Sequence, residues 1–215
     1  MSLEKRRRIA FFGYPMIDDN NDFRNNFVAQ FALTFKRAGW LAQFHKDESY
    51  WSFTRSLDQV DVRTSLSQRD VLSLPSNTRV VFPAGFSEPE LDRIFYRIAP
   101  PVKGDDAQPL VLKGLRIQED VPATKERQDA LISGISQKLI TWAGEEDAQL
   151  CIQDYAKPWL TERQTPHLAA LAYVGDFNTL MDYQDMFKRG KRANFYPYIT
   201  QEMLDRATDI ALARA

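Results

Sequence analysis

The sequence is poor in the side chains that most often build crosslinks and metal sites. It holds one cysteine, Cys151, and two histidines, His45 and His167. A single cysteine excludes an intrachain disulfide framework and a zinc cluster of thiolates. Neither histidine has a nucleophile and an orienting carboxylate at nearby spacing, as a catalytic triad would need. We therefore predict no cofactor and no metal, and we assign no catalytic residue.

An excess of one charge and clustered glycines are also lacking. The 28 Lys and Arg nearly cancel the 29 Asp and Glu, so no overall field favours nucleic acid, an anionic membrane or acidic substrates. The nine glycines are scattered singly, which excludes a P-loop and a dinucleotide-binding fingerprint. With 44% hydrophobic and 27% charged residues, the composition is that of an ordinary folded protein.

Long apolar runs are missing as well. The basic run Lys5–Arg8 is followed by the short apolar run Ile9–Phe12, which is far too short for a signal-peptide core or a membrane span. We therefore expect a cytoplasmic protein that does not enter membranes. The start Met1–Leu3 also fits a cloning remnant.

The sequence does contain a ladder of phenylalanines spaced four residues apart: Phe23, Phe27, Phe31 and Phe35. Residues four apart lie on nearly the same face of a helix, so the ladder predicts an amphipathic helix over 22–38. The polar cluster Asp18–Asp22 would cap its first turn, and Lys36, Arg37 and Gly39 are typical of its end. We expect the rings to be core, since large apolar stripes are rarely left in water. A partner-binding stripe is the alternative.

The first half of the chain shows several strand patterns. Residues 9–12 predict a first strand, and the alternating runs 40–45 and 50–55 predict an antiparallel hairpin around a turn at Asp47–Ser49. Residues 60–74 fit neither pattern well. Arg79–Phe82 predicts a strand that stops at Pro83.

A helix follows that strand. Ser87 and Glu90 form a capping box that predicts its start, and Pro100–Pro101 predicts its end. Residues 103–108 are a loop and the best candidate for a weak internal boundary.

The second half of the chain becomes helical towards its end. Residues 109–112 and 115–117 predict a strand or a bent pair of strands around Gly114, and Gln149–Ile152 predicts another strand. The apolar spacing also predicts four helices, over 131–142, 167–174, 177–189 and 201–213. Asp176 and Thr200 are the expected N-caps of the last two.

These elements favour an α+β fold, with an antiparallel sheet packed by long amphipathic helices and a helical C-terminal cap. We expect a mixed α+β domain over 1–155 and a cap over 156–215 that packs on it and is not an independent domain. The alternation of strands and helices leaves a three-layer α/β fold with a mostly parallel sheet as the alternative.

Several segments suggest chemistry, and each has a plainer structural explanation. Taken as an EF-hand from Asp18, the acidic run 18–22 would need a Glu at the position of Ala29, so we interpret it as a helix cap. Pro83–Glu88 resembles the Pro-Gly-Gly-x-Gly-Thr phosphate loop of the cytokinin-releasing phosphoribohydrolases, but Ala84, Ser87 and Glu88 depart from it. A structural turn is the better interpretation, and no residue roles are carried over.

The remaining candidates are a thiol, a serine motif and a basic patch. We expect Cys151 to be a small buried hydrophobe, and Ser133–Ser136 lacks the glycine pattern of a nucleophile elbow. The patch Lys188–Arg192, followed by three aromatics, combines cations and rings as nucleic-acid sites do. We favour a dipole-complementing helix end instead, because the overall charge is neutral. The aromatics are Phe195, Tyr196 and Tyr198.

No catalytic motif is recognisable, so we expect a non-enzymatic protein-interaction or chaperone-like module. The order of a leading amphipathic helix, a hairpin and the segment 79–98 resembles that of small type III secretion chaperones. The resemblance implies binding of another protein or of a second copy as a homodimer. The alternative is a small-molecule or nucleotide-binding enzyme or sensor, with its site at the strand-to-helix loops 13–22 and 83–87. Nucleic acid is the least favoured partner.

Overall fold

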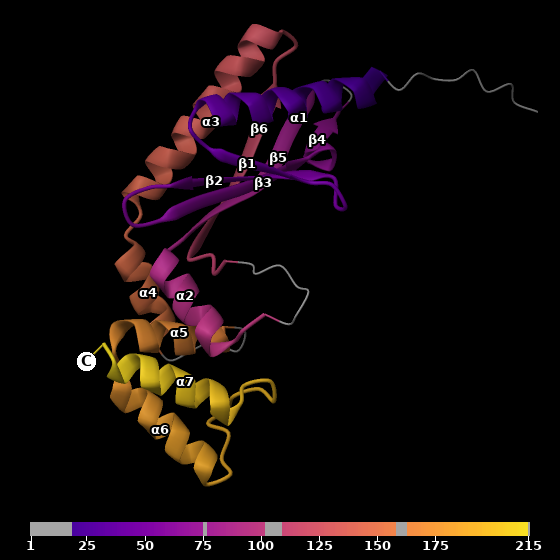
Figure 1. Cartoon of the computed structure of the whole chain (residues 1–215). Coiled ribbons are helices and arrows are strands. Elements are labelled where there is room, and N and C mark those ends of the chain that lie inside the picture. Colours follow the sequence, from indigo (N-terminus) through magenta and orange to yellow (C-terminus); the bar gives the residue numbers. More distant parts are fainter. Residues whose placement is uncertain (1–18, 75–76, 102–108, 158–162, 215) are drawn as a thin grey trace, which may run out of the picture.

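The computed structural model describes residues 19–74, 77–101, 109–157 and 163–214. These residues form an α+β fold, in which an antiparallel sheet is packed by helices (Figure 1). The strand expected over 9–12 and the loop 13–18 lie outside the described residues. The fold class expected from the sequence is confirmed.

The described residues contain six strands, seven α-helices and one 3₁₀ helix. The strands are β1 (Leu41–His45), β2 (Tyr50–Ser56), β3 (Asp61–Ser67), β4 (Val71–Ser73), β5 (Thr78–Ser87) and β6 (Lys113–Val121). The helices are α1 (Asp19–Arg37), η1 (Gln68–Asp70), α2 (Pro89–Ile98), α3 (Lys125–Glu145), α4 (Ala148–Ala156), α5 (Gln164–Val174), α6 (Phe177–Lys188) and α7 (Gln201–Leu212).

Every strand pairing in the sheet is antiparallel. The path runs β1-β2-β3-β5-β4, and β6 pairs with β5. Because β6 follows almost the whole length of β5, strands β3 and β4 share the other edge of β5. The expected hairpin is strand pair β1–β2. The alternative of a mostly parallel three-layer sheet is wrong.

The long strand β5 corrects two expectations. It continues through Pro83 to Ser87 instead of stopping at the proline. Strand β4 pairs with residues 78–80 and β3 with residues 84–87, so the ladder on this side is interrupted beside Pro83. A proline is tolerated where a ladder is interrupted, and its carbonyl accepts a hydrogen bond of 2.7 Å from the Thr64 hydroxyl.

The segment 60–74, which fitted no pattern in the sequence, forms the two strands β3 and β4 that pair with this side of β5. Strand β3 alternates in period two and buries Val62, Thr64 and Leu66. The 3₁₀ turn η1 then breaks the alternation before β4 resumes, and Ser67 caps it. The turn hid the strand pattern because it adds residues that belong to neither strand.

The phenylalanine helix covers one face of the sheet. Helices α1 and α3 lie against each other on that face (Figure 1). Phe27, Phe31 and Phe35 are fully buried, and the Phe31 ring lies 5.4 Å from Phe53 and 5.5 Å from Phe82. Phe23 is only partly buried. The ladder is therefore core, as expected.

The start of α2 differs from the expected capping box. Ser87 is the last residue of β5, and Glu88 is the N-cap, with its carboxylate accepting the Leu91 N–H at 2.5 Å. Pro89 occupies the first turn, where its missing N–H costs nothing. A similar shift occurs at β6, which begins only at Lys113, so residues 109–112 are not a strand.

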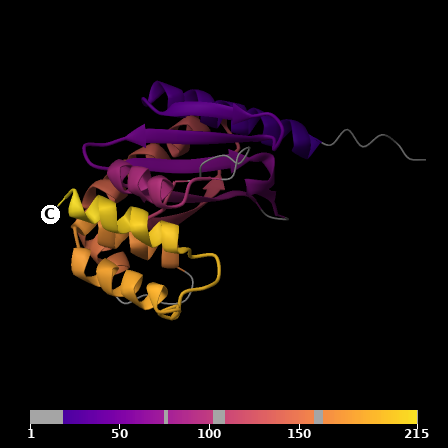
Figure 2. The ribbon, with the colours of Figure 1, turned by 60° about the horizontal axis from the view of Figure 1, so that its bottom comes forward.

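The C-terminal helices pack on α2 rather than on the sheet (Figure 2). Helices α5 and α7 lie against α2, and the Arg206 guanidinium donates to the Ile98 carbonyl at 3.2 Å. Asp176 and Thr200 cap α6 and α7 as expected. The predicted strand Gln149–Ile152 is wrong, because these residues lie within α4.

Candidate interaction surface

Strand β1 forms one edge of the sheet. Its inner side pairs with β2 from Leu41↔Thr54 to His45↔Tyr50. Within the described residues, no strand pairs with its outer side. The outward N–H and C=O groups of such an edge are a template for pairing with another chain.

The side chains of β1 do nothing to block such pairing. None of its five residues carries an acidic or basic side chain other than His45, and none is proline. Leu41 is 73% exposed and Phe44 is 50% exposed. Edge strands are commonly protected by lysines, prolines or bulges. Strand β1 has only its short length.

On each face of the sheet, a β1 side chain packs against an aromatic ring of β2. On the face towards α1, the Phe44 ring lies 5.2 Å from Trp51, and the Lys36 ammonium lies 5.0 Å above the Trp51 ring. On the other face, His45 stacks on Tyr50 at 4.4 Å, and its Nε2 is 2.8 Å from the Ser52 hydroxyl. His45 is therefore held in the strand by its neighbours.

Opposite charges lie beyond the two ends of β1. Lys36 and Arg37 end helix α1 just before the strand, and Asp47 and Glu48 form the turn just after it. In the described part of the chain, none of these four side chains makes an ion pair. The Arg55 guanidinium donates a hydrogen bond to the Ala38 carbonyl, which holds the end of α1 beside β2.

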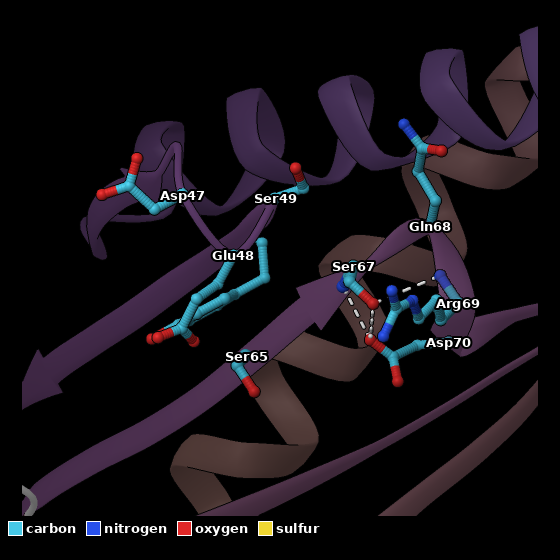
Figure 3. A pocket seen from close by; sticks show the side chains of 9 residues that line it. Asp47, Glu48, Ser49, Ser65, Ser67, Gln68, Arg69 and Asp70 are labelled. Carbon is cyan, nitrogen blue, oxygen red and sulfur yellow. Dashed lines mark hydrogen bonds between the residues drawn. The ribbon is translucent and has the colours of Figure 1, made fainter.

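A polar pocket of about 680 Å³ opens beside the acidic turn (Figure 3). Its lining residues come from the β1–β2 turn, the start of β2, the end of β3, and η1: Asp47, Glu48, Ser49, Tyr50, Ser65, Ser67, Gln68, Arg69 and Asp70. The Asp70 carboxylate accepts the Ser67 N–H at 2.6 Å and the Ser67 hydroxyl at 2.8 Å. Asp70 is thus committed to capping η1, and the remaining charged side chains of the lining are Asp47 and Glu48 of the acidic turn and Arg69 of η1.

The face of the sheet away from α1 is lined with hydroxyl groups. They belong to β2 and β3 and alternate with the buried residues of those strands. They are Tyr50, Ser52, Thr54, Ser56, Ser65 and Ser67. A polar outer face is typical of a solvated antiparallel sheet, so we assign it no ligand.

A buried polar cluster joins this face to α2. The Asp92 carboxylate accepts the Leu110 N–H at 2.7 Å and lies 3.8 Å from the Arg63 guanidinium, which also pairs with Asp61 at 3.2 Å. The Tyr96 hydroxyl and the Ser87 hydroxyl are buried, and neither has a hydrogen-bond partner among the described residues. The cluster connects β3, β5 and α2.

Burial dominates the electrostatics of this cluster. It raises the pKa of Asp92 above its usual value, while the Leu110 N–H, the nearby Ser87 hydroxyl and Arg63 oppose the shift. The Ser87 contribution is one of proximity, because its geometry does not make a hydrogen bond. Burial likewise raises the pKa of Tyr96. A carboxylate held by an amide and an ion pair fits a structural link between sheet and helix.

The second histidine is a buried structural residue. His167 is 1% exposed in the first turn of α5. Its Nδ1 is 2.8 Å from the Tyr155 carbonyl, and its Nε2 is 3.2 Å from the Tyr183 hydroxyl. Burial lowers its pKa. Both ring nitrogens therefore connect helices, and neither is presented to a substrate.

The thiol and the basic patch also have structural settings. Cys151 is half-buried on α4, and burial raises the pKa of its thiol, so it is not an activated nucleophile. Arg192 donates to the carbonyls of Phe195, Tyr196 and Ile199 and lies over the Phe187 ring. These contacts hold the loop between α6 and α7 in place.

The described segments of the alternative small-molecule site belong to a helix and a strand. Residues 83–87 belong to β5, residues 19–22 belong to the first turns of α1, and 13–18 lie outside the described residues. Across the described ranges, no three metal-ligating side chains cluster, and no helix there is long and apolar enough to cross a membrane.

Sequence reasoning recognised the β1–β2 hairpin but missed that β1 is an edge. The available signal was the contrast between the uncharged strand and the charges at both of its ends. The pocket could not be foreseen, because η1 was not recognised.

The fold and the exposed edge define an α+β protein with an antiparallel sheet, helices on one face and a helical region on α2. The chain belongs to the Family of unknown function (DUF6990), whose model matches residues 27–212. No curated protein and no solved structure matches it.

Proposed function

We propose that this protein is a non-enzymatic, chaperone-like interaction module that binds a partner chain by strand addition to β1. The observation that carries the proposal is the outer side of β1, which pairs with no strand in the described part of the chain and exposes Leu41 and Phe44 on its two faces. Strand addition gains main-chain hydrogen bonds along the edge and side-chain contacts at alternate positions.

The settings of the titratable groups support a non-enzymatic role. His167 uses both ring nitrogens between helices, and Asp92 links α2 to the sheet. The alternative small-molecule site at 83–87 has lost its strand-to-helix loop, because those residues pair within β5. A cytoplasmic location, expected from the sequence, belongs to the same proposal and is tested by cell fractionation.

Lysine-directed cross-linking in native lysate, read by mass spectrometry, tests the proposal. Lys46 is exposed in the turn after β1, and Lys191 is exposed after α6, so the second serves as an internal control. We expect cross-links to a partner chain from Lys46 and few from Lys191. Cross-links confined to Lys191, or none from Lys46, would contradict binding at the β1 edge.

A matched pair of variants controls for unspecific capture. Leu41→Glu places a charge on the exposed β1 edge, and Gln118→Glu places one on exposed β6. Only the first should reduce the cross-links from Lys46, because the two changes are alike in charge and exposure but differ in the strand.

A further inference from the structure

The β1 edge carries a pattern that is complementary to itself. Gln43 is the central residue of the strand, with Ala42 and Phe44 on either side of it and Leu41 and His45 at the ends. A two-fold axis through Gln43 aligns two copies antiparallel, so small Ala42 faces large Phe44, and Leu41 faces His45. Each contact then occurs twice.

We propose that the chain on the β1 edge is a second copy of this protein, paired antiparallel with Gln43 at the two-fold axis. This inference rests on the proposed function and names its partner. The two sheets become one continuous sheet, and the unpaired outer side of β1 is closed in both copies.

The exposed apolar side chains fit this arrangement. On the face towards α1, Phe44 covers the half-buried Ala42 of the second copy and extends the ring cluster that it forms with Trp51. On the opposite face, Leu41 meets the His45 ring, which is already stacked on Tyr50. Cross-strand pairs of aromatic and aliphatic side chains are among the stabilising contacts of sheets.

The charges beyond the strand are complementary under the same alignment. Extending the register places the acidic turn Asp47–Glu48 of one copy opposite residues 38–39 of the other. Those residues follow Lys36 and Arg37, so acidic and basic groups approach each other at both ends of the interface. A parallel alignment would bring like charges together, which disfavours it.

The expected affinity is modest. A strand of five residues is short of the roughly 800 Å² per partner that stable interfaces bury. The flanking charges and aromatic side chains enlarge the contact at both ends. We expect a dissociation constant in the micromolar range, on the order of 1 to 100 μM.

The main test is light scattering coupled to size-exclusion chromatography over a dilution series. The wild type should approach twice the monomer mass of 24.8 kDa at high concentration and dissociate on dilution. Gln43→Lys and Gln43→Glu should each weaken the dimer by about tenfold or more, since like charges meet across the axis. An equimolar mixture of the two variants should restore dimers.

The matched control is Gln118→Lys on β6, which makes the same exchange at an exposed position on the opposite edge. It should leave the dimer unchanged. Circular dichroism should show that all three variants stay folded, because Gln43 and Gln118 are both exposed. Higher salt should weaken the wild-type dimer by screening the charges at its ends.

The outcomes separate this inference from the proposed function. A chain that remains monomeric at every concentration, or a dimer insensitive to Gln43→Lys, overturns self-pairing at β1. If the mixture of Gln43→Lys and Gln43→Glu does not restore dimers, the two-fold axis does not pass through Gln43. If the monomeric chain still cross-links from Lys46 to another protein, only the second copy is refuted. If Lys46 cross-links to no chain, both proposals fail.

Discussion

Two edge strands of the sheet, β6 and β1, differ in how they meet solvent. Strand β6 is nine residues long and carries four charged side chains, Lys113, Arg116, Glu119 and Asp120. Lys113 pairs with Glu146, Glu119 with Lys138, and Asp120 with Arg79. Strand β1 has no such charges and exposes Leu41 and Phe44.

Of these two edge strands, only β6 carries charged side chains that oppose pairing with another strand. Charged side chains on an edge make the approach of another strand costly. Because the longer edge strand β6 carries charges and β1 does not, the exposure of β1 is not a general property of the sheet, and this difference is the reason for proposing β1 as the binding surface.

If β1 is an exposed edge, its side chains should contribute little to stability. The truncation of a core side chain gives the loss of stability with which this contribution is compared. Phe27→Ala should lower the free energy of unfolding by about 3–5 kcal/mol, because the Phe27 ring is 1% exposed. Phe44→Ala should cost less than about 1.5 kcal/mol, since half of its side chain is in solvent. Urea unfolding of both variants at a low, monomeric concentration measures this. Equal losses would make β1 a core strand.

A second test removes a contact far from both edges. His167→Leu should cost about 1–3 kcal/mol, because it removes the contacts that the buried His167 ring makes with the Tyr155 carbonyl and the Tyr183 hydroxyl. Thermal unfolding measures the loss. Dimer formation should be unchanged once the variant is folded, and a weakened dimer would tie β1 to the helical region.

Acidification should act on the same helical contact. The folded pKa of His167 lies below its ordinary value of 6.5 because of burial, so the unfolded chain binds the proton more readily. Its contribution to stability is complete above pH 6.5 and is lost as the pH falls towards the folded pKa. Hydrogen exchange should show α5 opening faster on acidification, and His167→Leu should remove that part of the pH dependence.

Removing charge from the guarded edge should make it behave more like β1. Arg116 and Asp120 are exposed on the same face of β6, and replacing both by leucine should cause concentration-dependent association beyond the dimer. The change in monomer stability should be small, below about 1 kcal/mol, because exposed ion pairs contribute little. Light scattering measures association. A variant that stays no larger than the wild type would show that charge does not guard β6.

Local patterns explain which elements could be predicted. The four-residue spacing of the phenylalanines determined α1, and the alternation of 40–45 and 50–55 determined the hairpin. Asp176 and Thr200 marked helix starts correctly, since a cap is a contact within one turn.

The errors arose where short patterns were ambiguous. Gln149–Ile152 has the apolar run of a strand, but Asp147 accepts the Leu150 N–H and starts α4. Pro83 appeared to end a strand, but the interruption between β3 and β4 accommodates it. The Asp147 cap is a contact within one turn that the apolar run obscured, whereas the interruption beside Pro83 depends on strands that are distant from it in the chain.

The candidate surface likewise has features that can be recognised in the sequence and features that only the tertiary structure shows. Its uncharged strand, acidic turn and basic helix end are all readable between Lys36 and Glu48 of the sequence. That the strand is an edge depends on the order of all the strands, and the pocket depends on how η1 approaches the β1–β2 turn. By itself, the sequence determined the helices and hairpin that arise from contacts between near neighbours. Only the tertiary structure decided which strands lie at the edges of the sheet, because pairing joins residues that are distant in the chain.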